Sequence, residues 1–566
     1  MLPAAARAGR RAALVCFAGV LRTGLTSARP CTSGRARARD PQDDGGQRAG
    51  RRNTPYWYFL QCKKLIRANQ LQEALDLFSR DMLAAQRLQP EESNYSVVIG
   101  GCGRGGRLRE AFALYNDMKK RGLQPSDATY TALFNACAES RRQPAGLQRA
   151  LKLEQDLRRQ GCQLSAVTYH ALLKVHARHN HLQACLYTLQ EMVQQGHAVT
   201  PQTFHYLLMA CVKDRDAGFR LALQVWRQML CSGLRPDSQN YNLLLRAARD
   251  CALGDPGLAS QLLLRPLRTR QDPDSSHKSA PIDVEVLLQQ QLLVRAAARP
   301  RDAGALISAG QNQDSKFAPN LLDLLEGKRG QVVSLGPVAE AADRLTLIGG
   351  AESLLDRMAA TGQRPDLRTL TLLADMMEPG PRTMETLLEA AKGHKVKLDT
   401  AFFNRAIRRA AKAGALEAAQ DVLQLMRQRR VSVDLRTFGS LALGCERPQQ
   451  ALQLLRDVEE AGFKPNLHIF SALIGRATRR LDYVYLKLIL KTMRRLEVWP
   501  NQLLIGQLEF AARYPPDYDQ FKSRNNYLVH IDGFRGYYQQ WLREMPAVEA
   551  DDQQEALQTQ SEQRGP

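Results

Sequence analysis

The sequence predicts an all-α fold, a right-handed α-solenoid in which helix-turn-helix repeats stack side by side in two arrays. Three observations support this fold class. The phrase "GLQPSDATYTALF" begins at Gly122, and its counterpart "GFKPNLHIFSALI" begins at Gly462. Pro-x steps that precede an aromatic residue recur with a period of about 35 residues, a spacing typical of stacked helical pairs. Within each unit, apolar residues recur at helical spacing.

Each unit carries the signals that start and end a helical hairpin. Pro125 prevents the preceding helix from continuing, and Ser126 is expected to cap the next one. Tyr130, Leu133 and Phe134 then share one face of the first helix. A Gly or Asn separates this helix from the second. Because one hairpin cannot bury its apolar face alone, neighbouring hairpins must stack.

The chain divides into repeat arrays and connecting segments. The predicted repeat units are 55–91, 92–126, 127–165, 166–200, 201–237, 238 to about 265, 367–399, 400–434, 435–466 and 467–501. The predicted segments are a transit peptide and disordered lead at 1–50, an N-terminal array at 55–265, a flexible insert at 266–340, a second array at 341–510, an aromatic C-terminal cap at 511–545 and a disordered tail at 546–566.

Two of these segments leave alternatives open. The insert is rich in polar, Pro and Gly residues, so it would let the two arrays move separately or would serve as a docking tail. The aromatic residues of 511–545 fit a cap over the last repeat, which we favour, or a surface on which bases stack.

The charge of the chain points to a polyanionic partner. Lys and Arg total 79 against 57 acids, a formal charge of +22, while apolar residues make up 44% of the chain. Nucleic acid is the first candidate, anionic lipid the second, and a merely soluble basic surface the third. No apolar run reaches about 18 residues, so we expect no membrane insertion.

The first forty residues resemble an address signal. Residues 1–39 hold eight Arg and no acid, as in a mitochondrial transit peptide. A secretory signal is the rival, because 12–21 can serve as a short apolar core. The eleven cysteines include no Cys-x-x-Cys pair and indicate reduced, buried thiols, which favours a reducing compartment. The predicted location is the mitochondrial matrix.

The repeat unit resembles a known family. Its end, Gly-x-x-Pro-[Asn/Asp/Ser] followed by x-x-x-[Tyr/Phe]-x-x-Leu, occurs at Gly122–Leu133 and Gly233–Leu244 and is similar to the pentatricopeptide repeat. "RRNTPYWYFLQCKKLI" at Arg51, the stretch 92–139 and "FRGYYQQWL" at Phe534 resemble a mitochondrial member of that family in animals.

This resemblance implies RNA as the partner. The implied clients are leucine tRNAs and their precursors, in 3′-end processing, and large-subunit ribosomal RNA, with mitochondrial RNA-processing enzymes as protein partners. A helical scaffold that binds peptides in its concave groove is the alternative.

The resemblance also implies base-reading residues. In the family, each repeat reads one base with the residue after the aromatic and the residue after Pro. These are Ser96 with Ser126, Thr131 with Ser165, His170 with Thr200, His205 with Asp237, Gly439 with Asn466, Thr371 with Asp399, Asn404 with Asp434, and Ser471 with Asn501, while Asn242 has no placeable partner. By the family's rule the last three pairs read G, U and A. Arg368 and Arg436 are candidates for stacking on bases or pairing with phosphates.

Each assignment has a structural alternative. The residues after Pro can be helix caps only, and the two arginines can be ordinary exposed side chains. "GCGRGG" at 101–106 matches a dinucleotide-binding pattern but lacks a strand before it, and "HARHNH" at 176–181 lacks a second pair of metal ligands. No paired-carboxylate or nucleophile motif appears, so we expect no catalytic residues, no metal, no cofactor and no enzymatic activity.

Overall fold

The computed structural model describes residues 54–140, 143–264, 320–322, 335, 338–513 and 526–545. Within these ranges the regular structure is helical, without strands. The predicted transit peptide, the tail and most of the insert lie outside them. None of the described helices is both long enough and apolar enough to cross a membrane.

The helices alternate between two layers, as the repeat pattern predicted. Every predicted unit begins where a first helix begins. The first helices are α1 (Pro55–Arg67), α3 (Glu92–Arg104), α5 (Asp127–Glu139), α7 (Ala166–Arg178), α9 (Pro201–Cys211), α11 (Ser238–Asp250), α16 (Leu367–Met376), α18 (Thr400–Lys412), α20 (Leu435–Ala442), α22 (Leu467–Arg479) and α24 (Gln502–Ala511).

The second helices complete the hairpins. They are α2 (Leu71–Asp76) with the π-helical segment η1 (Leu77–Ala85), α4 (Leu108–Lys120), α6 (Gln143–Arg159), α8 (Leu182–Gln194), α10 (Gly218–Cys231), α12 (Pro256–Leu263), α15 (Gly350–Ala360), α17 (Pro381–Gly393), α19 (Leu416–Gln428), α21 (Pro448–Glu460) and α23 (Tyr483–Arg495). Two further helices, α14 (Ala341–Thr346) and α25 (Asn526–Glu544), lie outside this alternation.

Local chemistry explains where the hairpins start and end. The residue after Pro, or its equivalent, is the N-cap of the following first helix: Asp434 accepts the Thr437 N–H at 2.8 Å, and Asn466 accepts the Ile469 N–H at 3.1 Å. At the ends of α10 and α21 the chain turns through Gly233 and Gly462, whose φ angles of 69° and 80° favour glycine.

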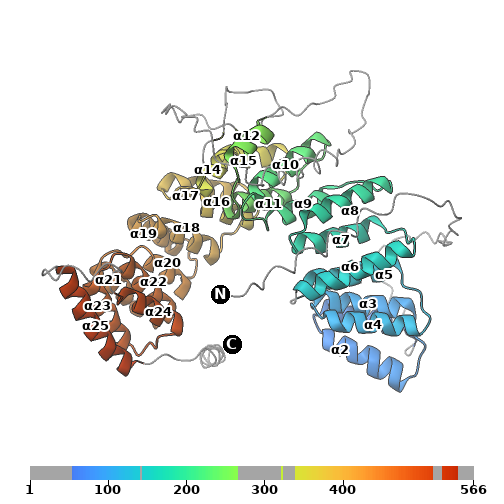
Figure 1. Cartoon of the computed structure of the whole chain (residues 1–566), viewed down its shortest axis with the longest axis horizontal. Coiled ribbons are helices and arrows are strands. Elements are labelled where there is room, and N and C mark those ends of the chain that lie inside the picture. The colour runs from blue at the N-terminus through green and yellow to red at the C-terminus, as the bar shows by residue number, and fades with distance from the viewer. Residues whose placement is uncertain are drawn as a thin grey trace, which may run out of the picture. The chain divides into compact units, whose positions relative to one another are not determined.

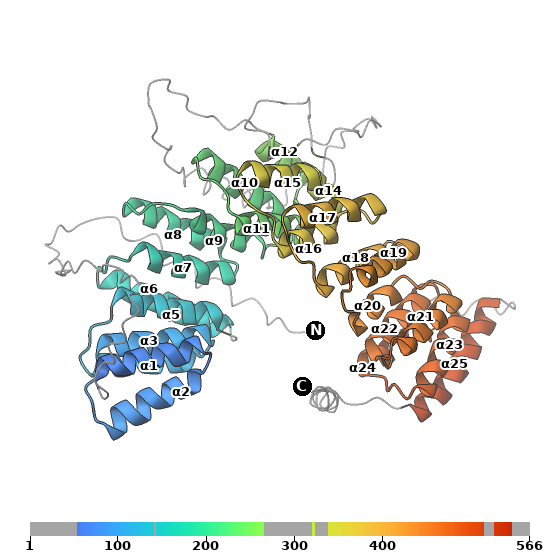
Figure 2. The ribbon, with the colours of Figure 1, turned by 180° about the vertical axis from the view of Figure 1, so that it is seen from behind.

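Stacking follows the order of the chain. Each first helix packs on the next, from α1 on α3 to α22 on α24, and α11 packs on α16 without an intervening first helix. Figure 1 and Figure 2 show the hairpins from opposite sides in this order. Their apolar faces form two core clusters, one from Tyr58 to Met192 and one from Leu173 to Met545. Seven of the nine described cysteines are buried, and all nine are free thiols.

The two arrays meet directly at α11, α14 and α16. Buried Arg344 of α14 donates from Nε to the carbonyl of Ala248 at 2.6 Å and from Nη2 to that of Arg249 at 3.4 Å, at the C-terminal end of α11. A cation at this end of a helix is favoured by the helix dipole. These contacts join the segments that the insert was expected to let move separately.

The last described helix, α25, packs on α23. Trp541 is buried and donates its indole N–H to the carbonyl of Leu490 at 3.1 Å, and the ring of Phe534 lies 5.3 Å from that of Tyr483. Because Trp541 and Phe534 are buried, they are not available as a surface on which bases stack.

Candidate nucleic-acid interface

Asn404 and Asp434 show the clearest geometry among the predicted base-reading pairs. Asn404 donates from Nδ2 to Asp434 Oδ1 at 3.0 Å. The hydroxyl of Thr437 lies 2.6 Å from Asn404 Oδ1 and 2.9 Å from Asp434 Oδ1. Partial burial raises the pKa of Asp434, but the hydrogen bonds from Asn404 and Thr437 outweigh it and hold the pKa below its usual value. We call these three residues the Asn404 notch.

Asp434 is therefore both a helix cap and a partner of Asn404. It caps α20 through the Thr437 N–H and meets the fifth residue of α18 with the same carboxylate. At this site both interpretations are correct: Asp434 is a helix cap and also a member of a polar pair.

Asn242 has a partner, which corrects the expectation that none could be placed. It donates from Nδ2 to Asp366 Oδ2 at 3.0 Å and accepts the Thr369 hydroxyl at 2.8 Å. Asp366 follows Pro365 and caps α16. Asn242, Asp366 and Thr369, here called the Asn242 notch, thus repeat the arrangement of the Asn404 notch. The sequence separation is 124 residues instead of 30, because the insert lies inside this repeat.

In the first array, a carboxylate that the sequence analysis did not single out links Ser96 to Ser126. Glu92 Oε1 lies 2.6 Å from the hydroxyls of both Ser126 and Thr129 and also accepts from Ser96. Burial raises the pKa of Glu92, but these hydrogen bonds outweigh it and lower the pKa. Because the hydroxyls of Ser96, Ser126 and Thr129 donate to Glu92, the group that can accept a hydrogen bond from a ligand at this position is the carboxylate of Glu92.

The next repeat uses Asp127 in the same way. Asp127 accepts from the Thr168 hydroxyl at 2.6 Å, from the Ser165 N–H at 3.2 Å and from the Ser165 hydroxyl. The Thr131 and Thr168 hydroxyls lie 2.7 Å apart. Glu92 and Asp127 are both the first residue of a first helix. Two acids at the same position of adjacent repeats were the signal available in the sequence.

The remaining pairs are not directly bonded. His170 Nε2 lies 2.9 Å from the Thr203 hydroxyl, which is 3.4 Å from that of Thr200, so Thr203 links the two predicted residues. His205 and Asp237 form no hydrogen bond with each other. Burial lowers the pKa of His205, and the charge of Asp237 offsets part of that shift.

In the second array, two further pairs also stay apart. Thr371 donates to the carbonyl of Leu367 at 2.6 Å, while Asp399 caps α18 through the Phe402 N–H at 2.9 Å. Asn501 caps α24, and no hydrogen bond joins it to Ser471 within the described chain.

The two predicted arginines keep exposed positions. Arg368 and Arg436 are each the second residue of a first helix, three residues before the fifth position and so on the same helix face. Neither forms an ion pair with another described residue. Both side chains are therefore free to meet a base or a phosphate.

A hollow runs along the first helices of the first array. It has a volume of about 730 Å³ and is lined by residues of α1, α3, α5 and α7, including Phe59, Glu92, Ser96, Thr131 and Lys174. The predicted reading residues Ser96 and Thr131 therefore open onto one continuous cavity.

The helix α18 carries a strong local excess of cations. It contains Arg405, Arg408, Arg409 and Lys412 and no acid. Arg405 pairs with Asp375 at 2.6 Å, whereas Arg408 and Lys412 form no ion pair within the described ranges. The free cations place positive charge on the helix that also carries Asn404, which favours a polyanion.

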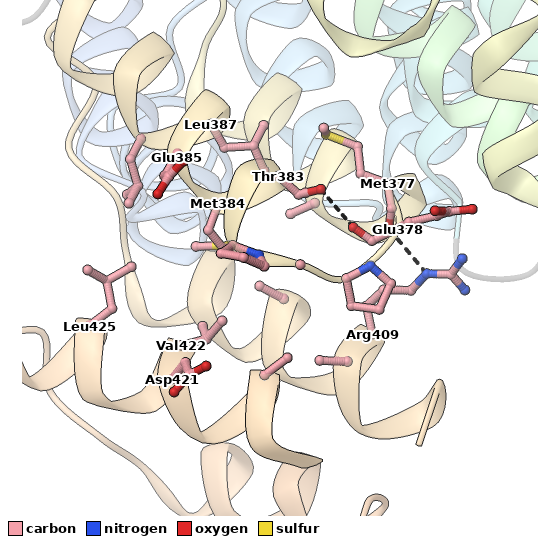
Figure 3. A pocket seen from close by; sticks show the side chains of 18 of the residues that line it. Met377, Glu378, Thr383, Met384, Glu385, Leu387, Arg409, Asp421, Val422 and Leu425 are labelled. Atoms are coloured by element: carbon pink, nitrogen blue, oxygen red, sulfur yellow. Dashed lines mark hydrogen bonds between the residues drawn. The ribbon is translucent and has the colours of Figure 1, made fainter. Parts of the chain in front are cut away.

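A second cavity, of about 280 Å³, has a different chemistry. It lies between α17 and α19 at the C-terminal ends of α16 and α18, and apolar side chains such as Leu387 and Val422 line it. Figure 3 shows Glu385 and Asp421 around this cavity and two hydrogen bonds that hold its edge: Thr383 to the carbonyl of Glu378 at 2.8 Å, and Arg409 to that of Met377 at 3.4 Å. Carboxylates beside an apolar cavity do not suit a phosphate backbone.

Residues of "GCGRGG" at 101–106 and "HARHNH" at 176–181 serve helix packing instead of binding a nucleotide or a metal ion. Gly101 and Gly103 lie inside α3, where a Cβ on Gly103 would come within 3.1 Å of the Ala132 carbonyl oxygen. His176 is buried in α7 rather than at the surface, and burial lowers its pKa to about 4. Among the described residues, no group of three or more His, Cys, Asp or Glu is arranged to hold a metal ion.

Comparison with known proteins identifies the family. A model of the PPR repeat family matches residues 90–139, and a model of the pentatricopeptide repeat domain matches residues 152–215. The pentatricopeptide repeat-containing protein 1, mitochondrial, of Rattus norvegicus is 48% identical over 542 residues, which cover 89% of this chain and 79% of the relative. Its Homo sapiens counterpart is 47% identical over 539 residues, covering 88% and 77%.

Among solved structures, the pentatricopeptide repeat protein PPR10 in complex with an 18-nt psaJ RNA element matches with a TM-score of 0.46 and 16% identity, over 85% of this chain and 61% of that chain. That likeness is too low to carry an argument. The sequence relatives are named mitochondrial, and this chain is mitochondrial. With almost half of its residues identical to theirs over most of both lengths, the chain belongs to the pentatricopeptide repeat family.

Proposed function

We propose that the chain is an RNA-binding adaptor of the mitochondrial matrix, which holds single-stranded RNA along its first helices and presents it to RNA-processing enzymes. Its proposed clients are leucine tRNAs and their precursors, during 3′-end processing, and large-subunit ribosomal RNA. The chain itself cuts no RNA.

The observation that carries this proposal is the polar notch that occurs twice. In the Asn404 notch, Asp434 uses Oδ1 for its hydrogen bonds to protein, which leaves Oδ2 as an acceptor, and Asn404 retains a second amide proton. One donor beside one acceptor is what an unstacked base edge requires. By the family's rule, Asn with Asp reads uracil, so the Asn404 notch is the proposed uracil site. In the Asn242 notch, Asn242 is buried and donates to both oxygens of Asp366, so that notch offers a base less.

The first array is proposed to read bases differently. The carboxyl groups of Glu92 and Asp127 already accept the hydroxyl protons of their neighbours. They favour base edges that donate, and they disfavour close approach of phosphate. The predicted readers Ser96, Thr131 and Ser165 then act together with these carboxylates.

Binding to oligouridine over a range of salt concentrations tests the RNA-binding part. Affinity should fall with salt at a slope of about −0.7 per phosphate contacted. Asn404→Ala should weaken binding about fivefold or more, because it removes base-edge hydrogen bonds. Thr386→Ala is the matched control, since Thr386 is a partly exposed residue of α17 that bonds only its own helix. Absence of salt-dependent RNA binding would favour the peptide-binding scaffold.

The cavity between α17 and α19 supports the adaptor part. Its apolar lining and the exposed Glu385 and Asp421 suit an apolar side chain flanked by basic residues on a partner protein. Reversing both charges with Glu385→Lys and Asp421→Lys should leave RNA affinity intact and cause precursor tRNA to accumulate in cells. Unchanged precursor levels would remove this surface from the proposal. Cleavage of precursor RNA by the purified chain would contradict the non-enzymatic role.

A further inference from the structure

The first helix, α1, departs from the pattern of the other repeats. Its fifth residue is Phe59, where α3 has Ser96 and α5 has Thr131. The helix contains no acid, and it carries Lys63, Lys64 and Arg67. A helix that joins aromatic rings to cations in this way is typical of surfaces that bind single-stranded nucleic acid.

Two of its rings lie next to each other, one exposed and one half-buried. Tyr56 is 60% exposed, and the ring of Phe59 lies 6.1 Å from it with an angle of 22° between their planes. The ammonium of Lys63 lies 5.5 Å from the centre of the Phe59 ring. Tyr58 is buried and meets Trp57 edge to face. The aromatic run therefore splits between a core side and an exposed side.

The exposed side of α1 borders the hollow that runs along the first helices of the first array. Phe59 lines the same 730 Å³ hollow as Ser96 and Thr131. The position of α1 at the end of the stack does not by itself explain the exposed rings beside cations, because the first helix at the opposite end lacks this combination. There α24 exposes Leu503 and Phe510 but has no Lys or Arg. Only the α1 end combines neighbouring rings, a cation and a shared cavity within the described helices.

We propose that Tyr56, Phe59 and Lys63 form a stacking platform for one unpaired nucleobase of RNA, next to the base held near Ser96. This inference rests on the proposed RNA-binding function. Phe59 has no hydrogen-bonding group and every base has a π face, so the platform accepts any base. Lys63 adds a cation for the adjoining phosphate. The repeat at α1 thus adds affinity without sequence selectivity.

Oligouridine that carries one 2-aminopurine, moved along the strand in a series of probes, tests the platform on the full chain. Stacking on an aromatic ring should quench 2-aminopurine at one position of the series. Tyr56→Ala and Phe59→Ala should abolish that quenching and weaken binding by about 5- to 150-fold, the range for loss of one stacked base. Replacing that nucleotide with an abasic one should weaken binding to the unmodified chain but not to the variants.

Two further variants separate stacking from folding. Phe59→Leu keeps apolar packing and removes the ring, and it should behave like Phe59→Ala in the quenching assay. Tyr187→Ala removes an exposed ring from α8 and should change nothing. If the chain binds oligouridine and responds to Asn404→Ala, but not to Tyr56→Ala and Phe59→Leu, the platform is wrong and the RNA-binding function stands. If no RNA binds at all, the proposed function itself fails.

Discussion

Exchanging the two halves of the Asn404 notch tests whether it reads a base. The chain supplies its own template, because Ser471 and Asn501 occupy the equivalent positions in a later repeat. Asn404→Ser with Asp434→Asn copies that pair. By the family's rule, the repeat should then prefer adenine to uracil at one nucleotide of the bound RNA.

The structure sets the size of the effect. Asp434 holds three hydrogen bonds, from Asn404 and from the N–H and hydroxyl of Thr437. Asn is about as good an N-cap as Asp, so α20 should keep its start, and loss of the charged acceptor should lower the free energy of unfolding by about 1 kcal/mol. A mismatched donor or acceptor against a base costs about 1–3 kcal/mol, which is about 5- to 150-fold in affinity.

Selection from a random RNA pool, followed by sequencing, measures the preference at each nucleotide. One position should change from U to A and the rest should stay as they were. Asp482→Asn is the control, because Asp482 caps the second helix α23 through the Tyr485 N–H at 2.9 Å. An unchanged preference, with RNA affinity intact, would show that Asn404 and Asp434 serve only the fold.

Three further predictions concern stability. Burial lowers the pKa of His176 to about 4, so its contribution to stability is complete above pH 6.5 and should be lost, by about 3 kcal/mol, as the pH falls toward 4. Burial raises the pKa of Glu154, which offsets part of that loss. Urea unfolding at pH 7 and pH 5 should show the lower stability at pH 5, and His176→Gln should reduce the difference. Trp541→Ala should destabilise the C-terminal repeats by about 3–5 kcal/mol in thermal unfolding, and an unchanged melting temperature would contradict its burial against α23. Asp366→Ala removes a cap and the bond to Asn242, so hydrogen exchange should accelerate in α16 by about 1–2 kcal/mol of opening free energy, with α3 unchanged.

Much of the fold could be predicted because its signals are local. Pro365 prevents the preceding helix from continuing, and Asp366 caps the start of α16. Both effects act within a few residues. The same logic placed Asp434 as a cap. What a local signal cannot give is the partner on the neighbouring helix, which is why Asn242 had no predicted partner although Asp366 was visible in the sequence.

The repeat register indicated which polar residues of the candidate site lie near one another, but not which of them donate and which accept hydrogen bonds. Ser96 and Ser126 lie together as the repeat register implied. Glu92, one helical turn before Ser96, takes their hydroxyl protons and changes what they can offer a base. Which of several nearby polar groups donates and which accepts depends on side-chain geometry, and a repeat motif does not contain it.

The sequence by itself determined the architecture: its period, its caps and its apolar faces specify hairpins that cannot remain single, and each of these acts over less than one repeat. Tertiary structure decided the rest. Stacking brought Asp366 to Asn242 across an insert, put Glu92 and Asp127 among the predicted readers, opened the hollow beside Phe59, and left an acid-rimmed cavity between α17 and α19. Those features depend on distances between helices that are far apart in the chain, and only their packing sets such distances.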